Sequence, residues 1–157
     1  MSLTRIISAV TVSCALIAGT AFAGGHSGNP AVKARKAHMQ LYQHNIGTLG
    51  GMARGNTEYN ADAATAAARN LATLATLDQS GYWPPGTDSD TLGDETAALP
   101  AIWEKFPAIL ENAQALASSS AALAETAGNG LEALQAGIGP VGGACGACHK
   151  AYQKPRG

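Results

Sequence analysis

Apolar residues recur at alternating steps of three and four along almost the whole chain, which is the spacing of one helix face. The pattern covers four segments, 30–54, 61–77, 99–126 and 131–153. Short polar turns separate the first pair and the last pair, whereas a loop rich in Gly, Pro, Ser, Thr and Asp, residues 78–96, separates the second segment from the third. Four amphipathic helices with two short connections and one long one predict an all-α fold, an antiparallel four-helix bundle.

Local signals place the helix ends and predict irregularities. Asn60 is an expected N-cap of the second helix. Pro107 lies inside the third segment and is expected to kink it. Gly47, Gly50 and Gly51 weaken the first helix, and we expect them to permit the close approach of another helix or a cofactor.

The N-terminal residues 1–23 are typical of a secretory signal peptide. Arg5 precedes a short apolar stretch, and Ala21-Phe22-Ala23 is the small-x-small pattern that precedes cleavage. Cys14 lies inside this segment and is interpreted as an ordinary signal-peptide residue, the alternative being a lipoprotein cysteine. We therefore predict one domain, residues 24–157, that is exported to the periplasm and has no membrane span.

Charge and composition exclude several classes of protein. The chain has 10 Lys and Arg against 11 Asp and Glu, without a basic stripe that would indicate nucleic-acid binding. We find no nucleophile–base pair or polar substrate site, so an enzyme is not predicted.

The segment Cys145-Gly146-Ala147-Cys148-His149 is the C-x-x-C-H signature of covalent c-type haem attachment. Two cysteines three residues apart on a helix face the same way, so both thiols can add to the vinyl groups of one haem. His149 follows four residues after Cys145, which places its imidazole beneath the ring as an axial iron ligand. The cofactor prediction is one covalent haem c.

Two alternatives exist for this pair of cysteines. A redox-active disulfide of the thioredoxin type would follow a strand and begin a helix, whereas this pair lies near the end of a long helix. A zinc site would need two further Cys or His ligands, and His26, His38 and His44 show no such spacing.

A four-helix bundle with its haem motif near the C-terminus resembles the class II cytochromes c, the family of cytochrome c′. The resemblance covers essentially the whole chain after the signal peptide. Besides the haem motif, it rests on three stretches: Ala31-Val32-Lys33-Ala34-Arg35-Lys36, Trp83-Pro84-Pro85-Gly86-Thr87 and Pro100-Ala101-Ile102-Trp103.

The resemblance places Met39 over the distal face of the haem, four residues after Arg35. If Met39 binds the iron, the protein resembles the low-spin, methionine-ligated branch of the family and is a one-electron carrier with redox partner proteins. If Met39 only packs as core, the iron is five-coordinate and its open distal site binds NO or CO. Electron transfer is the leading prediction.

Further haem contacts are also implied by the resemblance. Arg35 on an inward face needs a partner, and we expect its guanidinium to grip the haem propionates through two parallel hydrogen bonds. Lys36 is expected to reach the same region, and Thr91 falls near a haem-contacting position of the family. The alternative for Arg35 is a solvated position at the end of the bundle.

The remaining polar residues are expected at the surface. His38 and His44 lie off the inward stripe, and both are predicted to be exposed. The basic tail residues Lys150, Lys154 and Arg156 could steer an acidic redox partner. The alanine-rich helices permit a homodimer.

Overall fold

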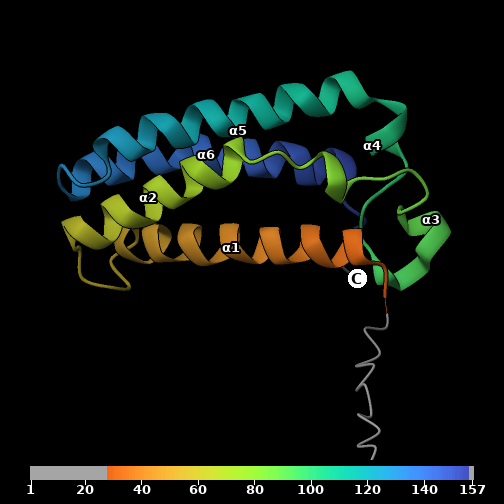
Figure 1. Cartoon of the computed structure of the whole chain (residues 1–157). Coiled ribbons are helices and arrows are strands. Elements are labelled where there is room, and N and C mark those ends of the chain that lie inside the picture. The colour runs from red at the N-terminus through yellow and green to blue at the C-terminus, as the bar shows by residue number, and fades with distance from the viewer. Residues whose placement is uncertain (1–27, 156–157) are drawn as a thin grey trace, which may run out of the picture.

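Four long helices lie side by side and form the body of the molecule (Figure 1). The computed structural model describes residues 28–155, so the predicted signal peptide, residues 1–23, lies outside the described residues. The helices are α1 (Pro30–Ala53), α2 (Ala61–Thr76), α5 (Phe106–Thr126) and α6 (Leu131–Tyr152). Each packs on the next, and α6 packs on α1, so that the four close into a bundle. The predicted all-α fold is confirmed.

Short elements fill the connection between α2 and α5 and cover one end of the bundle (Figure 1). They are the 3₁₀-helix η1 (Ser80–Tyr82), α3 (Ser89–Leu92), the 3₁₀-helix η2 (Gly93–Glu95) and α4 (Ala101–Glu104). The described chain also ends here, so α6 brings its last turns to this end. We call it the loop end.

The predicted third helix, 99–126, is divided at Lys105 into α4 and α5. Pro107 stands in the first turn of α5 and does not kink a continuous helix as predicted. Proline lacks a backbone N–H and its ring would clash with the preceding turn, whereas the first turn of a helix tolerates both features. Asn60 caps α2 as predicted, since its Oδ1 accepts a hydrogen bond from the Ala63 N–H at 2.8 Å.

Buried apolar residues form two separate clusters. The larger contains twelve residues from all four long helices: Tyr42, Leu49, Met52, Ala64, Ala67, Ala68, Leu71, Leu74, Leu123, Ala127, Leu134 and Val141. The smaller lies at the loop end and contains Ala98, Ile102 and Tyr152. Most of the burial that stabilises this bundle therefore lies away from the loop end.

The inward face of α1 differs from the predicted stripe at two positions. His38 is 4% exposed, contrary to the prediction of a surface position, whereas Met39 is 39% exposed. The buried positions 35, 38, 42, 45 and 49 follow the helical repeat of 3.6 residues. The inward stripe predicted from the apolar pattern, residues 32, 35, 39, 42, 46 and 49, differs from them by one position at 39 and at 46. His44 is exposed, as predicted.

The glycines of α1 do not make room for a neighbouring helix in the described chain. A Cβ atom at Gly47 would meet nothing within 4 Å. At Gly50 it would meet only the Arg54 side chain, and at Gly51 only the Thr57 side chain. Both residues follow α1 directly in the sequence and belong to none of the other long helices. The expectation of close helix approach was therefore wrong for these positions.

None of the helices within residues 28–155 combines the length and the apolar character needed to cross a membrane.

Candidate functional site

Cys145 and Cys148 lie three residues apart on α6, on the same side of the helix. Both are half-buried free thiols, and the next residue, His149, is exposed. Burial raises the pKa of both thiols, and the proximity of Cys145 raises that of Cys148 further. Burial therefore disfavours the thiolate form of both cysteines.

The thiol pair lies between the two apolar clusters. Cys148 contacts the smaller cluster at the loop end, together with Ile109 of α5. Cys145 lies near Tyr42 of α1, close enough for its charge to raise the pKa of that phenol. The pair therefore faces the interior of the bundle at the boundary of the loop end.

Two contacts fix how α1 and α6 lie against each other. The side-chain amide of Gln135 donates to the carbonyl of Ala53 at 2.8 Å, and Tyr42 lies near Cys145. From the first contact to the second, the residue number falls by eleven along α1, from 53 to 42, and rises by ten along α6, from 135 to 145. This is the relation expected of two antiparallel helices. One further turn in the same direction brings Met39 level with His149.

Met39 lies at the edge of the buried face of α1. It is separated from Ile46 by seven residues, which is close to two turns, so the two lie on one side of the helix. Ile46 is partly buried against the larger cluster, whereas Met39 is 39% exposed. Met39 and His149 thus lie on two helices that pack on each other, and ligation of the iron by either residue stays a prediction.

Arg35 points inward, as predicted, but its partners belong to the chain itself. Its Nη1 donates to Thr87 Oγ1 at 2.7 Å and to the Tyr82 carbonyl at 3.3 Å. Its Nη2 donates to Thr96 Oγ1 at 2.7 Å and to the Thr87 carbonyl. The guanidinium also lies 5.0 Å from the centre of the Trp83 ring.

These bonds use the four N–H groups of the two terminal nitrogens, so that only the Nε–H of Arg35 is left. The predicted grip on a propionate by two parallel bonds from the terminal nitrogens does not fit this arrangement. Burial lowers the pKa of Arg35, while the nearby carboxylates of Asp88 and Glu95 raise it. A role in cofactor binding through Nε or through charge stays a prediction.

The other predicted contacts lie apart from the interior. Lys36 is exposed on α1, next to Arg35. Thr91 is exposed in α3, where its N–H and its hydroxyl both donate to the Asp88 side chain, at 2.9 and 3.1 Å. Thr91 is thus bonded to Asp88, the N-cap residue of α3, and its predicted haem contact stays a prediction.

Sequence analysis missed Thr87 and Thr96, which are 3% and 4% exposed and hold Arg35. Thr87 stands in the Trp-Pro-Pro-Gly-Thr stretch, so its place after a Pro-Gly turn was an available signal. It also missed the burial of His38, whose ring packs edge-on against Tyr42 with 4.7 Å between ring centres and whose Nε2 has no hydrogen-bond partner within residues 28–155.

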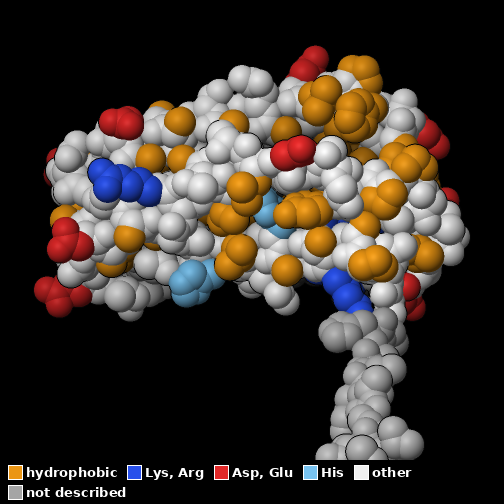
Figure 2. Space-filling model, viewed as in Figure 1, with side chains coloured by type: hydrophobic (Ala, Val, Ile, Leu, Met, Phe, Trp, Pro, Cys, Tyr) orange, Lys and Arg blue, Asp and Glu red, His pale blue; other side chains and the backbone are white. Residues whose placement is uncertain are grey.

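Large apolar side chains are exposed at the start of α5, beside the loop end. Phe106 and Leu110 are 52% and 53% exposed. Figure 2 shows hydrophobic side chains gathered over the end of the bundle where α4 meets α5. Ile109, three residues after Phe106 on α5, is partly buried against the smaller cluster, as Cys148 is.

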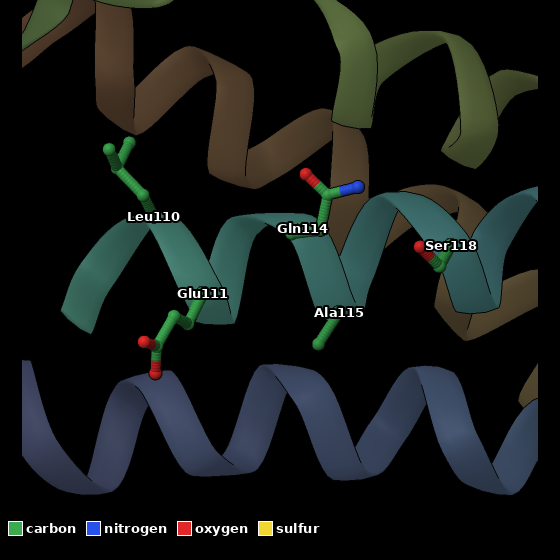
Figure 3. Close-up of a pocket in the computed structure, with 5 residues that line it drawn as sticks. All are labelled: Leu110, Glu111, Gln114, Ala115 and Ser118. Carbon is green, nitrogen blue, oxygen red and sulfur yellow. The ribbon is translucent and has the colours of Figure 1, made fainter. Parts of the chain in front are cut away.

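A shallow hollow of about 490 Å³ opens on α5 next to this patch (Figure 3). Leu110 and Glu111 lie at one end of it and Ser118 at the other, and the side chains of Glu111 and Ala115 point toward α6. None of the predicted haem residues lines this hollow.

The arrangement fits a covalent haem: two half-buried free thiols on one side of a helix, followed directly by an exposed histidine. A family model described as Cytochrome C′ matches residues 30–153. The chain belongs to the cytochrome c′ family. Its cofactor is haem c. Cys145 and Cys148 of the C-x-x-C-H motif are the residues that would hold it covalently.

Individual cytochromes of this kind are similar over most of their length. Cytochrome c-554 of Cereibacter sphaeroides is 35% identical over 123 residues, which cover 78% of this chain and 80% of the relative. A cytochrome c′ of the same organism is 35% identical over 125 residues, covering 80% and 83%.

Solved structures show the same fold. A cytochrome c′ from Rhodobacter sphaeroides has a TM-score of 0.78 and 38% identity, covering 80% of this chain and 96% of its own. The cytochrome c′ of Thermochromatium tepidum has a TM-score of 0.72 and 28% identity, covering 80% and 95%.

Proposed function

We propose that this cytochrome is a periplasmic one-electron carrier in which His149 and Met39 are the two axial ligands of the haem iron. The observation that supports the proposal is the helix register: Tyr42, three residues after Met39 on α1, lies near Cys145, four residues before His149 on α6. A relative that is 35% identical carries the name cytochrome c-554, and another, 28% identical, is named cytochrome c-556.

When bound, the haem would supply a one-electron couple, in which ferric iron takes an electron from one redox partner and ferrous iron passes it to another. The chain contributes two ligands on opposite helices and a largely apolar surrounding. An iron that keeps both ligands in the two oxidation states needs little rearrangement, and a soft thioether favours the ferrous state and raises the potential. Two filled axial positions also leave no place for a substrate, so no enzymatic activity is proposed.

Capture of NO or CO at an open distal site is the second candidate function. Three relatives are named cytochrome c′, and solved relatives from Alcaligenes xylosoxidans are described with bound carbon monoxide or NO. Met39 is 39% exposed, and its sulfur makes no hydrogen bond within the described residues. In this candidate Met39 packs beside the iron without binding it.

The absorption spectrum of the purified holoprotein separates the two candidates. A thioether-to-iron charge-transfer band in the ferric protein, lost in Met39→Leu, is the result expected for the carrier. Met52→Leu is the matched control, because Met52 is 2% exposed in the larger cluster and should leave the band unchanged. High-spin bands in the wild type and ready CO uptake by the ferrous form would contradict electron transfer and favour gas binding.

We also propose export through residues 1–23, soluble redox proteins as partners and a homodimer in solution. One related cytochrome c′ structure is described with ligand-controlled dimer dissociation. One of the basic residues predicted to attract a redox partner at the C-terminus is paired within the chain, since Lys154 Nζ lies 3.5 Å from Asp94 Oδ1. This ion pair lowers the positive charge available to a partner there. Sedimentation of the holoprotein with and without CO tests the dimer.

A further inference from the structure

The stretch Glu95–Leu99 contacts α1 on one side and α6 on the other, and we call it the bracket. On the α1 side, the backbone N–H of Asn29 donates to the Glu95 carboxylate, and Arg35 donates to Thr96 Oγ1 at 2.7 Å. The bracket is thereby joined to the first two turns of α1.

On the α6 side the bonds are between backbone atoms. The Leu99 N–H donates to the Tyr152 carbonyl at 3.0 Å, and the Lys154 N–H donates to the Ala97 carbonyl at 2.8 Å. Ala98 and Gln153 form an isolated antiparallel bridge between these two bonds. The bracket is thus paired with the last turn of α6 and the residues that follow it.

These attachments lie close to the two proposed axial ligands. Arg35 precedes Met39 by four residues, a rise of roughly 6 Å along α1. His149 precedes Tyr152 by three residues, a rise of roughly 4.5 Å along α6. The side-chain hydrogen bond that joins α1 directly to α6, from Gln135 to Ala53, lies at the opposite end of the bundle.

The core of the bracket is buried and rigidly bonded. Thr96 is 4% exposed, and its Oγ1 accepts both the Arg35 bond and the Ala98 N–H at 3.1 Å. Arg35 is 4% exposed and is held from its other side by Thr87. A hydrogen bond to a charged group in a buried place is strong and directional, so it resists changes in distance.

We propose that the bracket sets the distance between α1 and α6 at the haem, and that Arg35 and Thr96 are therefore positioning residues for Met39 and His149. A metal–ligand constellation tolerates displacements of only about 0.5 Å. A loosened bracket lets α1 move away from α6, so the Met39 side chain leaves coordinating distance in part of the population. This inference rests on the proposed function, because it takes Met39 as the distal ligand.

The experiment compares haem-loaded Thr96→Val and Arg35→Lys with the wild type. Thr96→Val keeps the side-chain shape and removes the acceptor, while Arg35→Lys keeps the charge and removes the planar fork. Because apparent CO affinity follows the fraction of molecules with an open distal site, we expect a weaker thioether band and about tenfold tighter CO binding by the ferrous form.

Tyr59→Phe is the matched control. The Tyr59 hydroxyl donates to the Ala127 carbonyl at 2.9 Å and accepts from the Gly130 N–H at 3.0 Å, so this partly buried residue joins two segments at the opposite end of the bundle. Its loss should lower the melting temperature without changing the band or the CO affinity. Equal effects of Thr96→Val and Tyr59→Phe on the spectrum would overturn the proposal.

Hydrogen exchange supplies a readout that does not depend on the iron. In Thr96→Val, amides in the first turns of α1 and at 152–154 should exchange faster together, whereas faster exchange on the α1 side alone contradicts a bracket. A wild type without the thioether band refutes the carrier function but not the bracket. In that case the exchange pattern alone decides whether the bracket joins α1 to α6, because CO affinity no longer reports the release of Met39.

Discussion

At the scale of single residues, Tyr42 connects α1 to the thiol pair. It is 8% exposed, packs against His38 and lies near Cys145. Burial raises its pKa to about 12, the charge of Cys145 adds to the rise, and a hydrogen bond with Gln79 opposes it. Attachment of haem at Cys145 would remove this charge and leave burial, already the largest cause, to raise the pKa of Tyr42.

This pKa makes stability depend on alkaline pH. The unfolded chain releases the Tyr42 proton near pH 10 and the folded chain only near 12, so the unfolded state is favoured progressively between these values. We expect the free energy of unfolding to fall there by up to about 1.4 kcal/mol per pH unit relative to Tyr42→Phe. Urea unfolding of both proteins at several pH values checks this, and parallel curves would contradict it.

The site could be predicted from sequence where a short motif or a helix repeat carries it. The thiol pair, His149 and Met39 were predicted from spacing and resemblance, and they lie on two helices that pack on each other, α6 and α1. The partners of Arg35 could not be found in this way, because Thr87 and Thr96 lie in a loop without periodicity and are brought to α1 only by the tertiary fold. His38 was misplaced by a single step of helical phase.

At the scale of elements, the sequence predicts the long helices to within one residue at most ends. The expected 30–54, 61–77 and 131–153 compare with Pro30–Ala53, Ala61–Thr76 and Leu131–Tyr152. Caps and breakers explain this agreement, since Asn29 Oδ1 accepts from the Ala31 N–H at 2.9 Å at the start of α1. The division at Lys105 was missed because apolar residues continue in phase across it.

Substitution of two helix glycines by alanine should change the free energy of unfolding in opposite directions. At Gly47, exposed on α1, a Cβ meets nothing within 4 Å, so Gly47→Ala should stabilise the protein by roughly 1 kcal/mol through helix propensity. At Gly137 on α6, the Cβ would lie 2.8 Å from Cδ1 of Leu123, which is 1% exposed. Overpacking costs about 1–3 kcal/mol, so Gly137→Ala should destabilise it.

Thermal unfolding of the two holoprotein variants is the measurement. We expect Gly47→Ala to raise the melting temperature by a few degrees and Gly137→Ala to lower it. Stabilisation by both substitutions would show that Leu123 adjusts without cost and that α5 and α6 are not tightly packed at this point.

At the scale of the whole molecule, the buried apolar residues form two clusters that stabilise different parts of the protein. Twelve buried residues of the larger cluster hold the four helices together, while three hold the loop end, where the thiol pair and the bracket lie. The bundle was predictable from periodicity because its larger cluster is made by regular helix faces. The loop end was not, because backbone and side-chain hydrogen bonds of residues 82–99 determine it.

Loss of the haem should therefore loosen one end of the molecule and spare the other. In the double variant Cys145→Ser, Cys148→Ser, which cannot attach haem, the loop end keeps only its small cluster and its hydrogen bonds. Local opening follows local burial, so amides of residues 80–104 and the last turns of α6 should lose protection most. Amides around Ala67, Leu71 and Leu134, in the larger cluster, should stay protected.

Hydrogen exchange of this apoprotein, compared with the holoprotein, measures both ends at once. The matched comparison within α6 is between Leu134, buried in the larger cluster, and Tyr152, buried in the smaller one. We expect a larger loss of protection at Tyr152. A uniform loss along the helix would mean that the haem stabilises a single cooperative unit, and that the twelve-residue cluster does not fold independently of the cofactor.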